Sequence, residues 1–507
     1  MAASDASVNN LIEASTSARV LAPAMAPSTT SRIIFGKTTR TILLTAALAL
    51  LPLAIPRLER ALGIKGQSYR EMLPNPRELI TFKGSQTKAG ELPGGPIQND
   101  QLSPLAAEPA DNDLGRKITD TNHTLDPFYS TLAHTEAKQA GAITRITHYG
   151  DSPVTNDGIT APVRRLLQER FGDAGHGFIL IDRPWAWYGH AAINFSSGGG
   201  WSNDSLMNPM VTDGAFGLGG VDFLRANGPG KYARFAPATD GETGKNFSVM
   251  DVYYERQPNG GLFEASVNNA NSQTVSTKGE AVESGFFEIK AAQSGSNTFE
   301  VKTTAGSVRL FGAVIENEGP GVVYDSLGVN GAHAGLLASV MNEQHWAAQL
   351  KHRNPNLIIL NYGTNESQYA SDDQMARYDK DLREVVRRVR AALPSVAILI
   401  VSPMDRGTHS GGKVITLPAI PKIVEMQRRV AAETNCAFLD LFAAMGGEGT
   451  MAKWHEGRNH LVGGDLTHPT AAGAEKIGEL IYDALIDGYT RYQARNPVRP
   501  SQLSALK

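Results

Sequence analysis

The chain has 507 residues, of which 41% are hydrophobic and 20% charged, a composition typical of a globular protein with ample material for a core. Its net charge of −3 shows no basic excess, which argues against nucleic acid as the main partner. The single cysteine, Cys436, excludes an intrachain disulfide, and its place in the apolar run CAFLDLF predicts a buried small residue. We expect two folded domains with tails.

The N-terminal residues are predicted to direct export. Residues 1–32 are rich in Ala, Ser and Thr, with little apolar periodicity, which predicts a disordered leader. Residues 33–57 combine Lys37 and Arg40 with an apolar run (TILLTAALALLPLAI) that is shorter than the about twenty residues of a full span. This pattern is typical of a signal peptide or membrane anchor, and the lack of an A-x-A cleavage site favours an anchor. A buried core helix is the alternative.

The predicted export segment implies a periplasmic protein, or one anchored in the inner membrane and facing the periplasm. Residues 85–126 are rich in Pro, Gly and polar side chains and show no periodicity, which predicts a linker. Such a linker would hold the folded part of the chain away from an anchor.

The folded part begins with a strand that ends at a serine. Residues 143–149 (ITRITHY) form an alternating apolar run that stops at a Gly-Asp-Ser tripeptide ending in Ser152. Residues 161–171 (APVRRLLQERF) then predict an amphipathic helix. A serine in a strand-to-helix turn is where an α/β sheet presents a nucleophile. The tripeptide alone is a weak signal, because a polar turn capped by Asp or Ser has the same composition.

The pattern changes after this helix. Residues 182–320 carry Gly clusters and short alternating runs such as FSVMDVYY and NTFEVKTT, which predict an inserted antiparallel β-sandwich. From residue 322 strands and helices alternate again, with strands expected at VVYDSLG, NLIILNYG, AILIVSP and CAFLDLF. With the first strand, these predict an α/β domain built on a doubly wound five-stranded parallel sheet. The domain is discontinuous and comprises residues 127–181 and 322–490.

Polar residues gather at the predicted carboxyl ends of these strands, where such sheets bind ligands. Ser152 follows the first strand, Gly331 the second and Asn365 the third, while Asp465 and His468 precede the last helix. Serine acyl transfer needs a nucleophile, an imidazole that takes its proton, a carboxylate that orients the imidazole, and donors for the oxyanion. Each requirement therefore has a candidate.

These segments resemble the SGNH or GDSL hydrolases, whose named blocks are Ser, Gly, Asn and His in that order. The matching segments are HYGDS, VNGAHA, YGTNES and DLTHP, within residues 143–182 and 322–486. The resemblance implies a flavodoxin-like sheet and a serine esterase without metal or cofactor. Ser152 would be the nucleophile, His468 the general base, and Asp465 the group that holds its ring.

The resemblance also implies an oxyanion hole. Its donors would be the backbone N–H of Ser152, the backbone N–H of Gly331 and the side-chain amide of Asn365. Two departures from the family pattern concern neighbouring residues. Pro153 restricts the backbone of the serine before it, and Glu366 stands where Asp is common. Pro153 affects the turn that presents Ser152, whereas Glu366 affects a helper residue and not the triad.

Other polar residues near these blocks have open interpretations. His333 follows the oxyanion glycine closely and either lines the pocket or lies outside it. Asp405 and Arg406 either border the site or form an ion pair in a loop. His455 and His460 flank a Gly-rich loop, but no spacing of Asp, His or Cys completes a metal site, so none is assigned.

The insertion bears on the substrate. Trp185, Trp187 and Tyr188 could stack on sugar rings, with the sandwich core as the alternative place for them. A long β-sandwich insertion behind an export segment resembles the peptidoglycan O-acetylesterases of bacterial envelopes. That resemblance implies an esterase that removes O-acetyl groups from a cell-envelope polysaccharide, with peptidoglycan as the expected one. Two alternatives remain: a short-chain or lipase-like carboxylesterase, and a non-catalytic glycan-binding envelope protein.

Overall fold

The computed structural model describes residues 117–497, except residues 199, 211–212, 225–229, 240 and 369–370. The predicted leader (1–32), the predicted signal or anchor segment (33–57) and residues 85–116 of the predicted linker lie outside the described residues. Among the helices that are described, none is long and apolar enough to cross a membrane.

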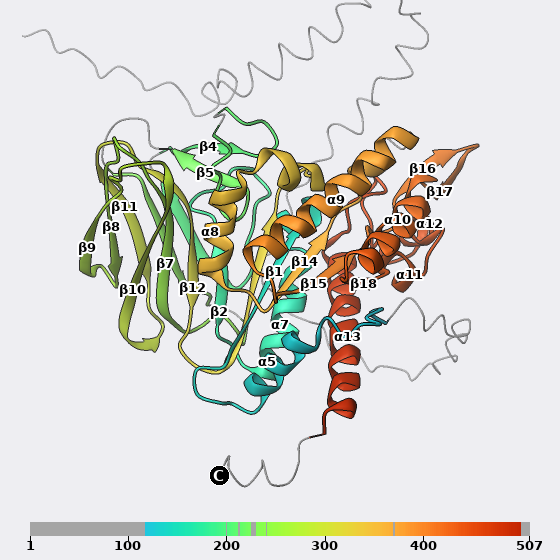
Figure 1. Cartoon of the computed structure of the whole chain (residues 1–507), viewed down its shortest axis with the longest axis horizontal. Coiled ribbons are helices and arrows are strands. Elements are labelled where there is room, and N and C mark those ends of the chain that lie inside the picture. Colours follow the sequence, from blue (N-terminus) through green and yellow to red (C-terminus); the bar gives the residue numbers. More distant parts are fainter. Residues whose placement is uncertain are drawn as a thin grey trace, which may run out of the picture. The chain divides into compact units, whose positions relative to one another are not determined.

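A five-stranded parallel sheet forms the centre of the α/β part (Figure 1). Its order is β13-β1-β14-β15-β18. The edge strand β13 is therefore the second strand of this sheet in the sequence, and it pairs with the first, β1. The strands are β1 (Ile143–Gly150), β13 (Gly321–Gly328), β14 (Leu357–Asn361), β15 (Ala397–Val401) and β18 (Ala437–Leu439). This is the predicted doubly wound sheet, and the order reverses between β1 and β14, where such sheets bind ligands.

Helices cover both faces of this sheet, which explains why β14 is apolar throughout (LIILN). Ile358 and Leu360 face one hydrophobic cluster, whereas Leu357 and Ile359 face the other. The first cluster includes residues of α8 (Glu343–Arg353), α9 (Asp372–Ala392) and α10 (Ala419–Glu433). The second includes residues of α5 (Asp126–Glu136), α7 (Thr160–Phe171) and α13 (Ala471–Arg495).

Shorter elements lie in the connections of the α/β part. They are α6 (Ser152–Thr155), η1 (Leu336–Val340), η2 (Glu366–Gln368), the hairpin β16 (Gly407–Ser410) and β17 (Lys413–Thr416), α11 (Leu441–Ala444) and α12 (Thr450–Glu456). Two of them, α6 and η2, begin at the polar blocks that follow β1 and β14.

Two antiparallel sheets separate the first βα unit from the rest of the α/β part, which confirms the predicted insertion. One has the order β10-β7-β12-β5-β4, with β2 also paired to β12, and the other has the order β3-β6-β11-β8-β9. The strands of the first are β2 (Gly175–Ile179), β4 (Ser202–Ser205), β5 (Val221–Leu224), β7 (Phe247–Arg256), β10 (Glu283–Gly295) and β12 (Arg309–Glu316). Those of the second are β3 (Ile193–Gly198), β6 (Tyr232–Pro237), β8 (Leu262–Val267), β9 (Ala270–Ser276) and β11 (Phe299–Ala305).

The antiparallel pairing starts earlier than the predicted boundary at residue 182, because β2 already pairs with β12. The run GHGFILI that contains β2 is apolar and lacks the alternation that marks the other strands. The backbone of this run also bonds to the α/β part, since the N–H of Phe178 donates to Asp325 of β13 at 2.9 Å.

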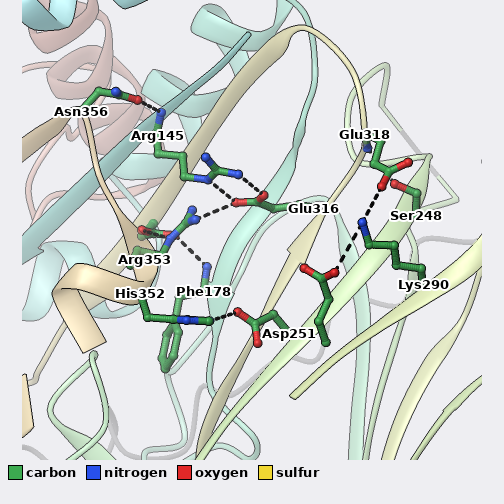
Figure 2. Close-up of polar contacts among 12 residues, drawn as sticks. Arg145, Phe178, Ser248, Asp251, Lys290, Glu316, Glu318, His352, Arg353 and Asn356 are labelled. Carbon is green, nitrogen blue, oxygen red and sulfur yellow. Dashed lines mark hydrogen bonds and ion pairs between the residues drawn. The ribbon is translucent and has the colours of Figure 1, made fainter. Parts of the chain in front are cut away.

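Buried charges join the insertion to the α/β part (Figure 2). Arg353, the last residue of α8, donates to Glu316 of β12 at 2.6 Å and to Asp325 at 2.8 and 2.9 Å. Arg145 of β1 donates to both carboxylate oxygens of Glu316, at 2.9 and 2.8 Å. Burial alone would raise the pKa of Glu316, but the two guanidinium groups lower it to about 2.

Candidate active site

The turn after β1 presents Ser152 at the carboxyl end of the sheet. Ser152 begins α6, and Pro153 lies in its first turn, where a missing N–H costs no hydrogen bond. The departure at Pro153 is therefore compatible with the turn. The helix sits tightly on β13, because a Cβ at Gly328 would lie 2.1 Å from the backbone nitrogen of Thr155. Glycine at this strand end lets the serine turn lie across the sheet.

The structure brings Ser152, His468 and Asp465 together in a chain of two hydrogen bonds. The Oγ of Ser152 lies 2.8 Å from Nε2 of His468, and Nδ1 of the same ring lies 2.6 Å from Oδ2 of Asp465. The side chains of His468 and Asp465 are 50% and 53% exposed, so the site is open to solvent. This is the arrangement in which an imidazole can accept the serine proton while a carboxylate fixes its tautomer.

The loop before α13 holds Asp465 in place. Its Oδ1 accepts hydrogen bonds from the backbone N–H of Thr467 and of His468, both at 3.0 Å. Partial burial raises the pKa of Asp465, but the hydrogen bonds from His468 and Thr467 outweigh it and hold that pKa below its ordinary value. The helix that follows, α13, begins at Ala471, and Thr470 is its N-cap.

Two of the three predicted oxyanion donors, Gly331 and Asn365, lie on adjoining loops. Gly331 has a φ of +76°, a left-handed conformation that favours glycine. The side-chain amide of Asn365 donates to the carbonyl of Ala332 at 2.8 Å, and because this nitrogen carries two hydrogens, one stays free for a ligand. Gly331 and Asn365 both line one cavity of about 470 Å³, and His333 lines it too.

Glu366, the second departure, has a structural place in the site. Its carboxylate accepts the backbone N–H of Ala334 and that of Gly363, each at 3.0 Å. It thereby ties the loop after β13 to the loop after β14. Burial raises its pKa to about 7 in spite of these hydrogen bonds.

The aromatic residues proposed for sugar stacking have different environments. Trp187 is 53% exposed, whereas Tyr188 is buried and its hydroxyl accepts the N–H of Leu180 at 3.0 Å. Trp185 packs partly buried against the hydrophobic core. The prediction for Tyr188 is therefore wrong, because its ring and hydroxyl are both occupied inside the protein. Trp185 likewise contributes to the core, and Trp187 keeps an accessible ring.

Two further residues, Asp151 and Arg406, lie close to the predicted triad. Asp151 is buried, one of its carboxylate oxygens has no hydrogen-bond partner among the described residues, and burial raises its pKa to about 7. Arg406 donates to the carbonyl of Thr364 at 2.9 Å and to the hydroxyl of Ser367 at 3.1 Å. Its neighbour Asp405 is buried and accepts the N–H of Met451 at 2.8 Å, so the two do not pair with each other.

Metal ligation finds no support within the part of the chain that the structure describes. No group of three or more His, Cys, Asp or Glu side chains could hold an ion there. His460 instead lies against the carbonyl of His455, with its Nδ1 3.0 Å from that oxygen.

Residues 292–476 match the model of the GDSL-like Lipase/Acylhydrolase family. The chain contains a GDSL-like lipase/acylhydrolase domain. This finding confirms the family resemblance drawn from the four sequence blocks. The matched part of the GDSL-like domain contains Gly331, Asn365, Asp465 and His468, whereas Ser152 precedes it in the sequence.

Two known proteins are similar to parts of this chain. An acetylxylan esterase of Xylanibacter ruminicola is 26% identical over 165 residues, which are 29% of this chain and 31% of that protein. The match thus spans about a third of the relative's length. A solved structure of a peptidoglycan O-acetylesterase is 23% identical, covers 74% of this chain and 99% of its own, and superposes with a TM-score of 0.63. This likeness confirms the predicted fold of the GDSL-like domain with its insertion; the catalytic roles of individual residues stay predictions.

Proposed function

We propose that this chain is a serine esterase that removes O-acetyl groups from a cell-envelope polysaccharide. The observation that carries the proposal is the pair of hydrogen bonds, 2.8 and 2.6 Å, that joins Ser152 to His468 and His468 to Asp465. A serine hydroxyl in such a chain loses its proton to the imidazole as it attacks a carbonyl carbon.

The proposed reaction has two halves. In the first, Ser152 Oγ bonds to the acetyl carbon, Nε2 of His468 takes the hydroxyl proton, and the carbonyl oxygen gains a negative charge. The backbone N–H groups of Ser152 and Gly331 and the free N–H of Asn365 would stabilise that charge. His468 then gives the proton to the sugar oxygen, which leaves. In the second half, Nε2 of His468 takes a proton from water as the water oxygen bonds to the acetyl carbon; the bond to Ser152 Oγ then breaks, Oγ receives that proton, and acetate leaves.

The choice of substrate rests on the similar proteins. One is named for acetylxylan and the other for O-acetylated peptidoglycan, so both names combine an acetyl ester with a polysaccharide. The peptidoglycan O-acetylesterase covers most of this chain, insertion included, and therefore favours peptidoglycan as the proposed polysaccharide. Export to the periplasm, through residues 33–57 as a signal peptide or membrane anchor, belongs to the same proposal, since peptidoglycan lies there.

The first experiment tests catalysis. Purified protein is expected to hydrolyse p-nitrophenyl acetate, and Ser152→Ala to lose this activity while keeping its circular dichroism spectrum. Equal rates for the two proteins would leave the non-catalytic glycan-binding protein as the better interpretation.

The second experiment tests the substrate. Acetate release is measured from O-acetylated cell-wall glycan and from O-acetylated xylan, together with a p-nitrophenyl ester series from acetate to octanoate. We expect a steep preference for acetate and faster release from the cell-wall glycan. A preference for octanoate would favour the lipase-like alternative, and faster release from xylan would reject peptidoglycan.

A further inference from the structure

The cavity beside the predicted oxyanion residues has walls from four parts of the chain. The loop after β13 contributes Gly331 and His333, and the loop after β14 contributes Asn365. The remaining walls come from α9 and from Met207 of the insertion. With a volume of about 470 Å³, the cavity lies within the range of about 300 to 1,000 Å³ typical of small-molecule sites.

Three polar side chains in this cavity have unused hydrogen-bonding capacity. Among the described residues, no hydrogen bond or ion pair engages the side chains of His333, Arg377 or Asp381. Two of them converge on one point, since a Cβ at Gly335 would lie 2.7 Å from Oδ2 of Asp381 and 2.9 Å from Nδ1 of His333. Burial lowers the pKa of His333, and the nearby charge of Asp381 opposes this shift.

The insertion contributes Met207 to the wall of the cavity. A Cβ at Gly331 would lie 3.3 Å from the methyl carbon of Met207, so the methionine lies directly over the oxyanion glycine. Met207 follows β4, at the start of the connection to β5. An apolar thioether and charged groups in one cavity suit a ring with a C–H face and hydroxyl edges.

The size and polarity of the cavity decide which part of an ester it accepts. When the carbonyl oxygen lies between Gly331 and Asn365, the acyl group and the alcohol point to different sides of the serine. An acetyl group needs room for one methyl, far less than the cavity provides. A longer acyl chain would bury Arg377 and Asp381 without hydrogen-bond partners, which is costly. A polyhydroxylated alcohol would satisfy them.

We propose that this cavity is the subsite for the sugar ring that carries the acetyl group, with Asp381, Arg377 and His333 binding its hydroxyl or amide substituents. The inference rests on the proposed esterase function and names the chemistry of its leaving group. The leaving alcohol is a pyranose, and α9 together with the insertion determines which pyranose fits.

The test compares a sugar ester with an ester that lacks a sugar. The full chain and its Asp381→Asn and Arg377→Gln variants are assayed on a mono-O-acetylated N-acetylhexosamine disaccharide and on p-nitrophenyl acetate. The ratio of the two kcat/KM values is expected to fall about 10-fold or more in each variant, because a hydrogen bond to the sugar is lost. Much of the fall in this ratio should come from a higher KM for the disaccharide.

Matched controls lie on the same helix outside the cavity. Lys380→Gln and Asp373→Asn remove one charge each from exposed positions of α9, and their ratios are expected to stay within about 2-fold of the unchanged protein. A wild-type ratio in both Asp381→Asn and Arg377→Gln would overturn the sugar subsite and leave the esterase proposal intact. Hydrolysis of p-nitrophenyl acetate without any release of acetate from the disaccharide or from cell-wall glycan would overturn the proposed function, and the subsite with it.

Discussion

Arg353 and Asp325 are joined by two parallel hydrogen bonds, from Nε to Oδ2 at 2.8 Å and from Nη2 to Oδ1 at 2.9 Å. Both residues are buried, with exposed fractions of 4% and 0%, and the guanidinium also reaches Glu316. A bidentate pair of this kind is strong and fixes the orientation of its partners. It links α8 to the strand that precedes the oxyanion loop.

Arg353→Met is expected to destabilise the protein by about 3 to 5 kcal/mol, because Asp325 loses its only described guanidinium partner in a buried site. The free energy of unfolding in urea measures the change. Arg429→Met is the control, since Arg429 is 56% exposed in its ion pair with Asp379, and exposed pairs contribute about 1 kcal/mol or less. Similar losses for the two variants would show that the buried network adds nothing.

Asn365→Ala is expected to lower kcat for p-nitrophenyl acetate about 100- to 1,000-fold, with a small change in KM, because the amide would act on the transition state. Asn365→Asp keeps the size of the side chain but removes the donor, and should lose as much or more. Steady-state kinetics measure both. If Asn365→Asp retained wild-type kcat, the amide would not be an oxyanion donor.

Asp151→Asn tests the buried carboxyl beside the nucleophile. Burial raises the pKa of Asp151 from 3.8 to about 7, so between these pH values the unfolded chain releases a proton that the folded protein keeps. The contribution of Asp151 to stability therefore falls as the pH rises from about 4 to 7, and then levels off. Asp151→Asn has no carboxyl group to ionise at this position, so its stability lacks this pH-dependent fall.

The melting temperature of Asp151→Asn, relative to wild type, is accordingly expected to rise between pH 4 and pH 8. Thermal unfolding in buffers of equal ionic strength checks it. A constant difference across this range would mean that Asp151 ionises with an ordinary pKa.

Arg406→Ala is expected to lower kcat about 10-fold or more, because Thr364 and Ser367 lose a charged donor worth about 1.5 to 3 kcal/mol. These residues flank Asn365 and Glu366, so we expect Arg406 to position the predicted oxyanion loop. Arg406→Lys should recover part of the rate. Lys413→Ala, on the exposed hairpin strand β17, is the control. Unchanged kcat in Arg406→Ala, with only a lower melting temperature, would limit Arg406 to a structural role.

The parallel sheet and the positions of its polar blocks could be predicted from the sequence because each signal is local. A buried strand such as LIILN and the turn that follows it lie within a few residues of each other. Since the carboxyl ends of parallel strands meet at one edge, the strand pattern predicts that Ser152, Gly331 and Asn365 lie near one another. The place of His468 beside Ser152 was instead implied by the resemblance to the SGNH hydrolases.

Burial and long-range pairing could not be predicted in the same way. Trp187 and Tyr188 are sequence neighbours, yet one is exposed and the other is buried, because their surroundings come from distant strands. Arg353 and Glu316 give no local sign of pairing. The place of Arg406 under the oxyanion loop likewise depends on the packing of the loops after β14 and β15.

Ser152 and His468, the proposed nucleophile and base, are separated by 316 positions, and the whole insertion lies between them. During synthesis the serine emerges early, whereas the imidazole emerges close to the last helix of the described chain. Contacts this distant form late in folding, since the loop between them must first be ordered. A nascent or unfolded chain therefore carries a serine without its base, and hydrolysis can begin only once both halves of the domain have closed around the insertion.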